Sequence, residues 1–260
     1  MTNVLDLDSA LSISWKINED QLFEKTFLLQ RFIGSMWFTQ DSIRQLSGNF
    51  LDETVDPLNT INDYRLFSPN ECGADYTSRI HRNILLRVDD NDEQRASFRW
   101  NPYDDWINGV EEYEIYLSVD GDSLQMVGAT SDTRFTFMND SLGFDYCFRV
   151  KAIENGGNNS FSWSNAACAL FTPPLYAYNV ITPNQDDKNE SFVIDNIDKY
   201  PNSRLVIYNR WGSKVLDRVG YQNDWNGRDV SSGVYFYILE LNEPRVSTKS
   251  INGQISVLKR

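Results

Sequence analysis

The single histidine and the three cysteines of this 260-residue sequence are the side chains best suited to nucleophilic, acid–base or zinc chemistry. His81 stands between Ile80 and Arg82, just before a predicted strand. A catalytic triad needs a histidine beside a serine or cysteine and an orienting acid, and the sequence has no G-x-S-x-G motif to supply the nucleophile. One histidine and three scattered cysteines also make a tetrahedral zinc site improbable. We therefore expect this chain not to be an enzyme.

Adjacent acidic residues are the next candidates, because paired carboxylates hydrolyse glycosidic bonds. The sequence contains Asp104-Asp105, Glu111-Glu112 and Asp186-Asp187. On a strand, neighbouring side chains point to opposite faces, so such pairs do not face each other across a substrate. We expect solvated edges at these positions.

Composition limits the partners. The formal net charge is −13, and nucleic acids and anionic membrane surfaces are polyanions that require compensating Lys and Arg. No apolar stretch approaches the roughly 20 residues that a membrane-spanning helix needs. An apolar content of 41% with 13% aromatic residues excludes a disordered chain. We expect no nucleic-acid partner and no direct insertion into a membrane.

Short segments in which apolar and polar residues alternate are the elements that would position any site. Leu-Ser-Ile-Ser-Trp-Lys, from residue 11, alternates apolar and polar residues as a half-buried strand does, whereas Leu46 to Asn59 is rich in Asp, Asn and Gly and is predicted to be loop. No segment shows a helical period of useful length, so we predict an all-β protein. Further strands are predicted at 27–32, 62–67, 84–88, 96–100, 110–116, 124–127, 134–137, 146–152, 176–181, 191–194, 204–210, 214–218, 234–241 and 254–258.

The pattern of short predicted strands occurs twice before residue 174. Residues 89–173 resemble a fibronectin type III domain, with Trp100 on an early strand and Tyr146 to Ala152 as the penultimate one. Residues 1–88 resemble a trimmed copy of it, in which Asp63-Tyr64-Arg65-Leu66 takes the place of Asp145 to Arg149. Consecutive prolines at 173 and 174 end the second module, because proline removes a backbone donor. This resemblance implies tandem β-sandwiches.

Residues 174–260 carry a second resemblance. The segments Asn209-Arg210-Trp211-Gly212, Asn223-Asp224-Trp225-Asn226-Gly227 and Ser232 to Tyr237 look like the gliding-motility-associated C-terminal domain, the type B targeting domain of the type IX secretion system in Bacteroidota. The resemblance implies a C-terminal immunoglobulin-like β-sandwich. It also implies export, although Met1-Thr2-Asn3-Val4 is no signal peptide, so we expect a fragment of a longer precursor.

The partner-binding candidates in this domain are Asn209, Arg210, Trp211, Gly212, Leu258 and Arg260. If residues 204–211 are one strand, alternation sends Leu205, Ile207, Asn209 and Trp211 to one face. Trp211 would then fill the core, and Arg210 would lie on an aromatic face or contact the secretion machinery. Leu258 and Arg260 end a terminal segment that could add to a partner's sheet.

Two further sites follow from the resemblances. Thr182 to Phe192 resembles the family's Asp- and Gly-rich turn, but Gln185 and Asp187 stand where glycines are usual. Asn184, Asp186 and Asn189 could ligate Ca²⁺, or the segment could be a turn stabilised by its own side chains. No other cofactor is expected. In a fibronectin-type sandwich Cys147 and Cys168 would be neighbours, so they could form a disulfide or stay as buried thiols, which leaves Cys72 odd.

The preferred function is therefore that of a C-terminal fragment of a secreted gliding adhesin at the cell surface. By resemblance, its last domain would dock to an outer-membrane protein of the PorP/SprF family and pass through the type IX translocon. The alternative is that the fibronectin-like modules bind a polysaccharide or another surface protein. Trp100, Tyr103 and Trp106 would then be the platform, because exposed aromatic rings stack on sugars.

Overall fold

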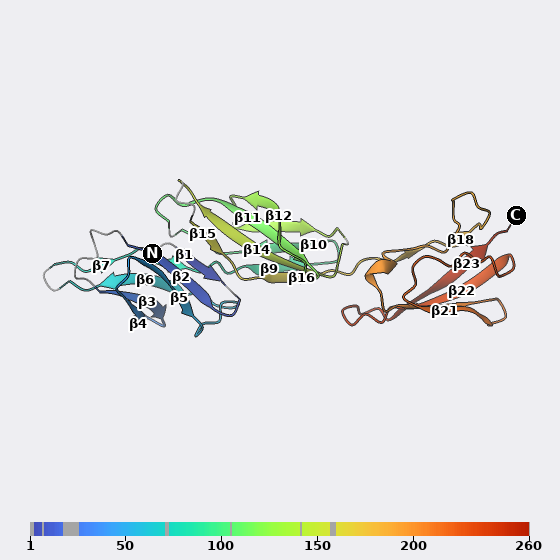
Figure 1. Cartoon of the computed structure of the whole chain (residues 1–260), viewed down its shortest axis with the longest axis horizontal. Coiled ribbons are helices and arrows are strands. Elements are labelled where there is room, and N and C mark those ends of the chain that lie inside the picture. Colours follow the sequence, from blue (N-terminus) through green and yellow to red (C-terminus); the bar gives the residue numbers. More distant parts are fainter. Residues whose placement is uncertain are drawn as a thin grey trace. The chain divides into compact units, whose positions relative to one another are not determined.

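The structure is a computed structural model, and it describes the chain except residues 1, 2, 7, 18–25, 71, 72, 105, 141, 157–159 and 260. The described residues form β-strands in six sheets, one 3₁₀ turn and no α-helix (Figure 1). The all-β prediction is therefore confirmed. None of the described segments is a helix long and apolar enough to cross a membrane.

Contacts divide the chain into two compact units. The N-terminal unit comprises Met1–Asp140 and Asp145–Phe171, and the C-terminal unit comprises Ser141–Phe144 and Thr172–Arg260. Three separate clusters of buried apolar side chains form the core, two in the N-terminal unit and one centred on the C-terminal unit. The predicted domain limits at residues 88 and 173 stay a prediction.

The first sandwich packs the sheet β1-β2-β5 against the sheet β4-β3-β6-β7, in which β8 also pairs with β6. Leu11 and Ile13 of one sheet meet Leu29 and Leu66 of the other in a shared core, as alternation predicts. The strands are β1 (Asn3–Asp6), β2 (Leu11–Lys16), β3 (Phe27–Ile33), β4 (Met36–Ile43), β5 (Ser47–Asp52), β6 (Asp63–Ser68), β7 (Tyr76–Thr77) and β8 (His81–Arg82).

The prediction that 46–59 is all loop is wrong, because β5 pairs with β2 along its whole length. Composition misleads here since tertiary packing determines the strand. A Cβ atom on Gly48 would lie only 2.7 Å from the ring of Trp15. The glycine that suggests a loop is therefore what lets the tryptophan lie against the strand.

The second sandwich packs the sheet β13-β10-β9 against the sheet β12-β11-β14-β15, in which β16 also pairs with β14. Phe98 of β10 contacts Phe148 of β14, with 4.4 Å between ring centroids. The strands are β9 (Arg87–Asn91), β10 (Arg95–Arg99), β11 (Val110–Val119), β12 (Gln125–Thr130), β13 (Arg134–Met138), β14 (Asp145–Glu154), β15 (Phe161–Trp163) and β16 (Ala167–Leu170).

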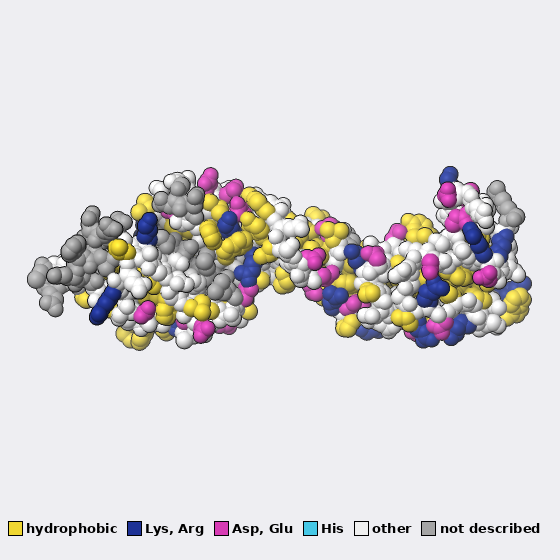
Figure 2. Space-filling model, viewed as in Figure 1, with side chains coloured by type: hydrophobic (Ala, Val, Ile, Leu, Met, Phe, Trp, Pro, Cys, Tyr) yellow, Lys and Arg dark blue, Asp and Glu magenta, His cyan; other side chains and the backbone are white. Residues whose placement is uncertain are grey.

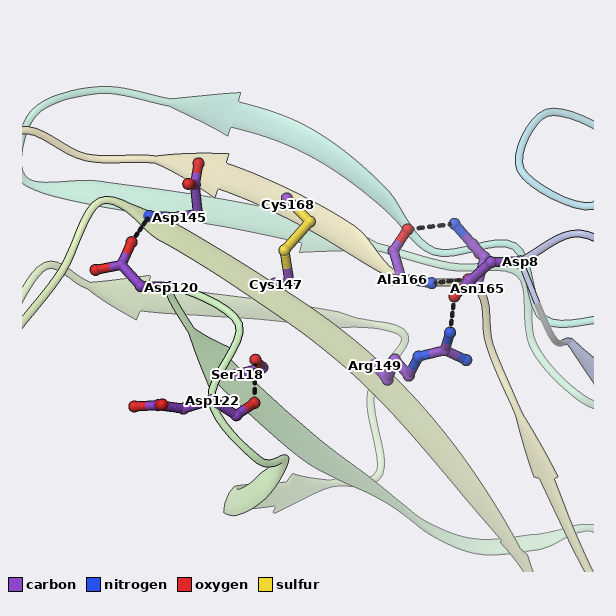
Figure 3. The surroundings of a disulfide bond; sticks show 10 residues. All are labelled: Asp8, Ser118, Asp120, Asp122, Asp145, Cys147, Arg149, Asn165, Ala166 and Cys168. Carbon is purple, nitrogen blue, oxygen red and sulfur yellow. Dashed lines mark hydrogen bonds and ion pairs between the residues drawn. A yellow bond between two sulfur atoms is a disulfide. The ribbon is translucent and has the colours of Figure 1, made fainter. Parts of the chain in front are cut away.

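A disulfide joins the long strand β14 to β16, the last strand of this sandwich. Cys147 on β14 lies directly opposite Cys168 on β16, with 4.0 Å between their Cα atoms (Figure 3). Cys72 lies outside the described residues. The bond closes the chain over 21 residues of sequence separation and includes β15.

The proposed aromatic platform is wrong. Trp100, Tyr103 and Trp106 are all about 95% buried or more and belong to the core of the second sandwich. The ring of Tyr103 packs on that of Trp106 at 4.4 Å, and Trp100 packs on Tyr113 at 5.5 Å. Rings that are buried in the core of the sandwich cannot stack on a sugar, because their faces already pack against other side chains.

His81 is buried within the N-terminal unit, where its side chain is only 3% exposed. Its Nδ1 atom lies 3.2 Å from the hydroxyl of Tyr103, which comes from the second sandwich. Burial lowers the pKa of His81 to about 3, since the charged imidazolium would lose its hydration. The histidine therefore makes a structural contact between the two sandwiches of the N-terminal unit through Tyr103.

We expect this histidine to make the N-terminal unit less stable in acid. The unfolded chain binds a proton below a pKa of about 6.5 and the folded chain does not, so stability present above that pH is lost as the pH falls. Between pH 7 and pH 5 the loss is about 2 kcal/mol. Urea unfolding of the parent chain and of His81→Gln at both pH values measures it. A pH dependence that persists unchanged in the variant contradicts this assignment.

In the C-terminal unit, side chains of the five-stranded sheet β18-β23-β22-β20-β21 and of the small sheet β17-β19 form one core. Strands β18 and β21 are the two edge strands of the larger sheet (Figure 1). The elements are β17 (Tyr176–Ala177), β18 (Val180–Ile181), β19 (Ile194–Asp195), η2 (Ile197–Lys199), β20 (Arg204–Tyr208), β21 (Lys214–Val219), β22 (Gly233–Glu240) and β23 (Ser250–Val257).

Candidate functional site

The turn between β20 and β21 is built by two of the predicted partner-binding residues. The side-chain oxygen of Asn209 accepts hydrogen bonds from the N–H groups of Trp211, at 3.0 Å, and Ser213, at 2.9 Å. Gly212 closes the turn with a φ of +80°, a left-handed conformation in which a Cβ atom is unfavourable. Asn209 and Gly212 therefore hold the backbone of this turn.

The other two residues project from it. Trp211 is 74% exposed, and the guanidinium carbon of Arg210 lies 4.3 Å from the centre of its ring. The prediction that Trp211 fills the core is wrong, because β20 ends at Tyr208 and the alternation of a strand does not continue through a turn. The hydrogen bonds to Asn209 turn the chain outward before residue 211.

An apolar stripe lies on the outward face of the neighbouring strand β22. Val234, Phe236 and Ile238 are 43%, 48% and 40% exposed, whereas the intervening Tyr235 and Tyr237 point into the core. Residues that pair across strands share a face, so Tyr208 of β20 lies beside Phe236. We call Tyr208, Val234, Phe236 and Ile238 the apolar stripe.

A charged cluster borders this stripe on the same sheet. Arg204 of β20 binds both carboxylate oxygens of Asp217 at 2.8 Å, and Lys214 binds one of them at 2.6 Å. The hydrogen bonds from Arg204, and then those from Lys214, lower the pKa of Asp217 well below its usual range. Glu240 on β22 lies 3.6 Å from Arg204. The cluster holds two positive and two negative groups, so it is balanced in charge.

A shallow open groove of about 510 Å³ lies between β20, β22 and β23. Rings and an aliphatic chain line it from the apolar stripe, and two amide side chains line it from β23. The lining residues are Tyr208, Phe236, Tyr237, Ile238, Asn252, Gly253 and Gln254. The groove combines exposed apolar area with hydrogen-bonding groups, which suits binding of another macromolecule.

Comparison with known protein families agrees with this geometry. Residues 175–257 match the CHU_C family, which is described as the type IX secretion signal domain. Residues 175–257 are a type IX secretion signal domain. The match implies that the protein is exported and that this domain interacts with the type IX secretion machinery.

The part before the secretion signal domain also has a family match. Residues 87–162 match the PBP1-like, fibronectin3-like domain. The tandem order that the sequence predicts, a fibronectin-like domain before a secretion signal, is thus confirmed.

Three solved structures are similar to parts or all of the chain. The pectate lyase Pel3 of Pectobacterium carotovorum is 27% identical over 38% of this chain and 31% of its own, with a TM-score of 0.27, so the chain spans about a third of that enzyme's length. A tetra-tandem repeat in the extending region of a large adhesion protein is 10% identical over 98% and 73% of the two chains, with a TM-score of 0.33. The chicken CNTN1 FN1–FN3 domains are 14% identical over 98% and 97%, with a TM-score of 0.27.

The C-terminal strand of the secretion signal domain is not a free strand at its end. Ser256 and Val257 of β23 pair with β22 on one side and with β18 on the other, and the N–H of Leu258 donates to Ile181 at 3.0 Å. Both edges at 256 and 257 are already paired, so the prediction that the terminal segment adds to a partner's sheet is wrong for these two residues, and the partner-binding role of Leu258 stays a prediction. Arg260 lies outside the described residues.

The turn at 182–192 uses its polar side chains internally. The side-chain oxygens of Asn184 and Asp186 accept the N–H groups of Asp186 and Lys188, at 3.2 and 3.0 Å. Asn189 contributes its carbonyl oxygen, which accepts the N–H of Thr182 at 2.7 Å. Within the described residues no group of three or more His, Cys, Asp or Glu could hold a metal. Calcium binding by Asn184, Asp186 and Asn189 stays a prediction, which calorimetric titration with Ca²⁺ would test.

The same turn shows why glycine is usual at two of its positions. Gln185 and Asp187 have φ values of +67° and +63°. Gln185→Gly is expected to raise the stability of the C-terminal unit by about 0.5–1 kcal/mol, because a β-carbon is unfavourable in this conformation. Lys188→Gly, at a position without positive φ, is the control and is expected to lower it. Thermal unfolding compares the two; equal effects contradict the argument.

The apolar stripe was missed in the sequence, although a signal for it exists. Both alternating sets of β22 are apolar, since Val234, Phe236 and Ile238 interleave with Tyr235 and Tyr237. Such a strand in an antiparallel sheet either is buried on both faces or exposes one apolar face. Only the sheet order, which leaves this face uncovered, decides between the two.

Proposed function

We propose that the 209–212 turn and the apolar stripe form the surface by which this domain docks to an outer-membrane protein of the PorP/SprF family. The chain would then be the export-directing end of a gliding adhesin of the Bacteroidota cell surface, with no enzymatic activity and no cofactor of its own. The observation that carries the proposal is the exposed Trp211. The hydrogen-bonded turn holds the ring of Trp211 in solvent, and exposing this apolar surface to water is unfavourable. A partner that buries the ring would gain that free energy on binding.

Arg210 adds hydrogen-bond donors to this surface. Its guanidinium stacks on Trp211, and a planar guanidinium on an aromatic ring keeps its N–H groups available at the rim. Interfaces are enriched in Trp and Arg at the positions that contribute most to binding. The resemblance to the type B targeting domain, the match to a secretion signal domain and this exposed pair all support the same partner.

The test uses the full chain behind a secretory signal peptide, fused to a fluorescent reporter, in a gliding bacterium with and without its PorP/SprF-family protein. Trp211→Ala and Arg210→Ala are expected to keep the melting temperature and to lose export. Truncating a central tryptophan costs about 2 kcal/mol or more, or roughly thirtyfold in affinity. The matched control is Tyr176→Ala, which removes another exposed ring of the same unit. Export of Trp211→Ala at the parent level, or export without the partner, contradicts the proposal.

A second candidate function, polysaccharide binding by the first sandwich, is supported by a different face from the one the sequence suggested. On the outward side of β4, β3 and β6, the guanidinium of Arg65 lies 4.2 Å from the ring centre of Trp37 and 5.3 Å from that of Phe67. Gln30 accepts the Nε–H of Arg65 at 2.9 Å, and Phe32 packs on Trp37. Rings and hydrogen-bonding groups on one sheet face suit a sugar chain. A glycan array with the full chain and Trp37→Ala tests this; a blank array removes it.

A further inference from the structure

The strand β23 is paired on both sides only near its end. Its whole length pairs with β22, but β18 covers only Ser256 and Val257 on the other side. The preceding residues, from Ser250 to Ile255, therefore have a strand neighbour on one side alone. The secretion signal domain thus has an open sheet edge at 250–255, next to the groove that borders the apolar stripe.

The hydrogen bonds show which main-chain groups face this edge. The N–H of Ser256 donates to the carbonyl oxygen of Asn179, at 2.8 Å, so the main chain of Ser256 faces β18 and not β22. In an antiparallel pair the direction of these groups alternates with a period of two residues. The N–H and C=O groups of Gln254 and Asn252 therefore point to the same side as those of Ser256, where β18 no longer runs.

The side chains around the edge indicate what could lie there. Gln254 lies beside Phe236, and Asn252 lies beside Ile238, so each amide flanks a member of the apolar stripe. Both amide side chains are exposed. Main-chain groups that repeat every second residue match an extended strand, and alternate side chains of such a strand would lie beside Asn252 and Gln254 on the face that carries the stripe.

Charge favours an uncharged occupant. Residues 172–260 contain 11 Lys and Arg and 10 Asp and Glu, whereas residues 1–171 contain 13 and 27. On the visible face of the C-terminal unit the two signs are mixed (Figure 2). A domain with a formal charge near zero offers little net attraction to a segment of either sign, so apolar contacts and main-chain hydrogen bonds would supply the binding.

We propose that Asn252 and Gln254 receive an extended, largely apolar segment of the outer-membrane partner as an added strand of the sheet. The added strand continues the position of β18 along β23 and lies beside Asn252 and Gln254, at the margin of the groove. This proposal rests on the proposed function, since it names how the same partner binds. Strand addition is thus proposed at residues 250–255 of β23, where one edge is open, and not at residues 256 and 257, where both edges are paired.

The experiment compares two substitutions at one position in the full chain. Gln254→Pro removes the N–H that faces the edge and leaves the pairing with β22 intact, whereas Gln254→Ala removes the side chain and keeps the N–H. Binding to the purified PorP/SprF-family protein in detergent is measured for both. We expect the proline to weaken binding about tenfold or more and the alanine less than about threefold. Gly253 is left unchanged, because a Cβ there would lie 2.7 Å from Tyr237.

Hydrogen exchange keeps the proposal testable if the proline lowers the melting temperature. In the complex of the parent chain, the amides of Asn252 and Gln254 are expected to exchange about tenfold more slowly than in the free chain. Unchanged exchange, or binding of a folded Gln254→Pro at the parent level, overturns strand addition. If Trp211→Ala still abolishes binding in that case, docking itself stands. A parent chain that fails to bind removes both proposals, and a self-dimer that only the proline abolishes assigns the edge to a second copy.

Discussion

Replacing Asp52 with alanine is expected to lower the free energy of unfolding of the N-terminal unit by about 3–5 kcal/mol, because it breaks a buried ion pair on one side only. Asp52, at the end of β5, is 1% exposed. Its carboxylate accepts hydrogen bonds from Arg31 at 2.6 Å and from the hydroxyl of Tyr64 at 2.8 Å. The variant would leave that hydroxyl without this acceptor in the core and Arg31 without its ion pair.

The ionisation of these groups supports the size of the effect. Burial opposes the charge on Asp52, but hydrogen bonds from Thr54 and Tyr64 outweigh it, so the pKa of Asp52 falls below its ordinary value. Burial, and then the neighbouring carboxylate, raises the pKa of Tyr64. A carboxyl with a lowered pKa contributes stability that is present above its unfolded pKa and is lost as the pH falls through the folded value.

The measurement is urea unfolding of the full chain at neutral pH. Asp56→Ala is the matched control, since Asp56 lies a few residues further on, is exposed, and its carboxylate accepts a local hydrogen bond from Asn59. We expect about 0.5 kcal/mol or less for the control. Similar losses for the two variants would show that Asp52 does not stabilise the core as the geometry indicates.

Strands with one buried face could be predicted from the sequence, and β2 and β14 show why. In each, every second residue is buried in the same cluster, from Leu11 to Trp15 and from Tyr146 to Ala152. This period of two is a property of the chain itself and needs no knowledge of neighbours. The order of the fibronectin-like and secretion signal domains rests on local motifs and could be found in the same way.

The ends of strands and the roles of aromatic residues could not be predicted. Trp211 continues the alternation of β20 in the sequence, yet the side chain of Asn209 ends the strand before it. Conversely, Trp106 follows a polar loop but packs in a core that residues from distant strands complete. In both cases burial depends on tertiary neighbours or on one side-chain hydrogen bond, which periodicity does not contain.

The candidate docking surface shows the same limit. Arg210 and Trp211 could be selected from the sequence because they belong to a motif, whereas Gln254 belongs to none and Phe236 lies in a motif that does not show which of its side chains are exposed. They form one groove only because β22 and β23 are neighbours in the sheet with this register. The open edge at 250–255 depends further on β18 being two residues long.

Loss of the disulfide is expected to lower the free energy of unfolding of the N-terminal unit by about 3 kcal/mol, because Cys147 and Cys168 close a loop with a sequence separation of 21 residues. The measurement is urea unfolding with and without a reductant. Cys147→Ala/Cys168→Ala should show the low stability in both conditions, whereas Cys72→Ala should respond like the parent chain. Since β14 and β16 are already paired at this register, the folded state should survive reduction and only its stability should fall. A reductant effect that persists in the double variant would place the sensitive bond elsewhere.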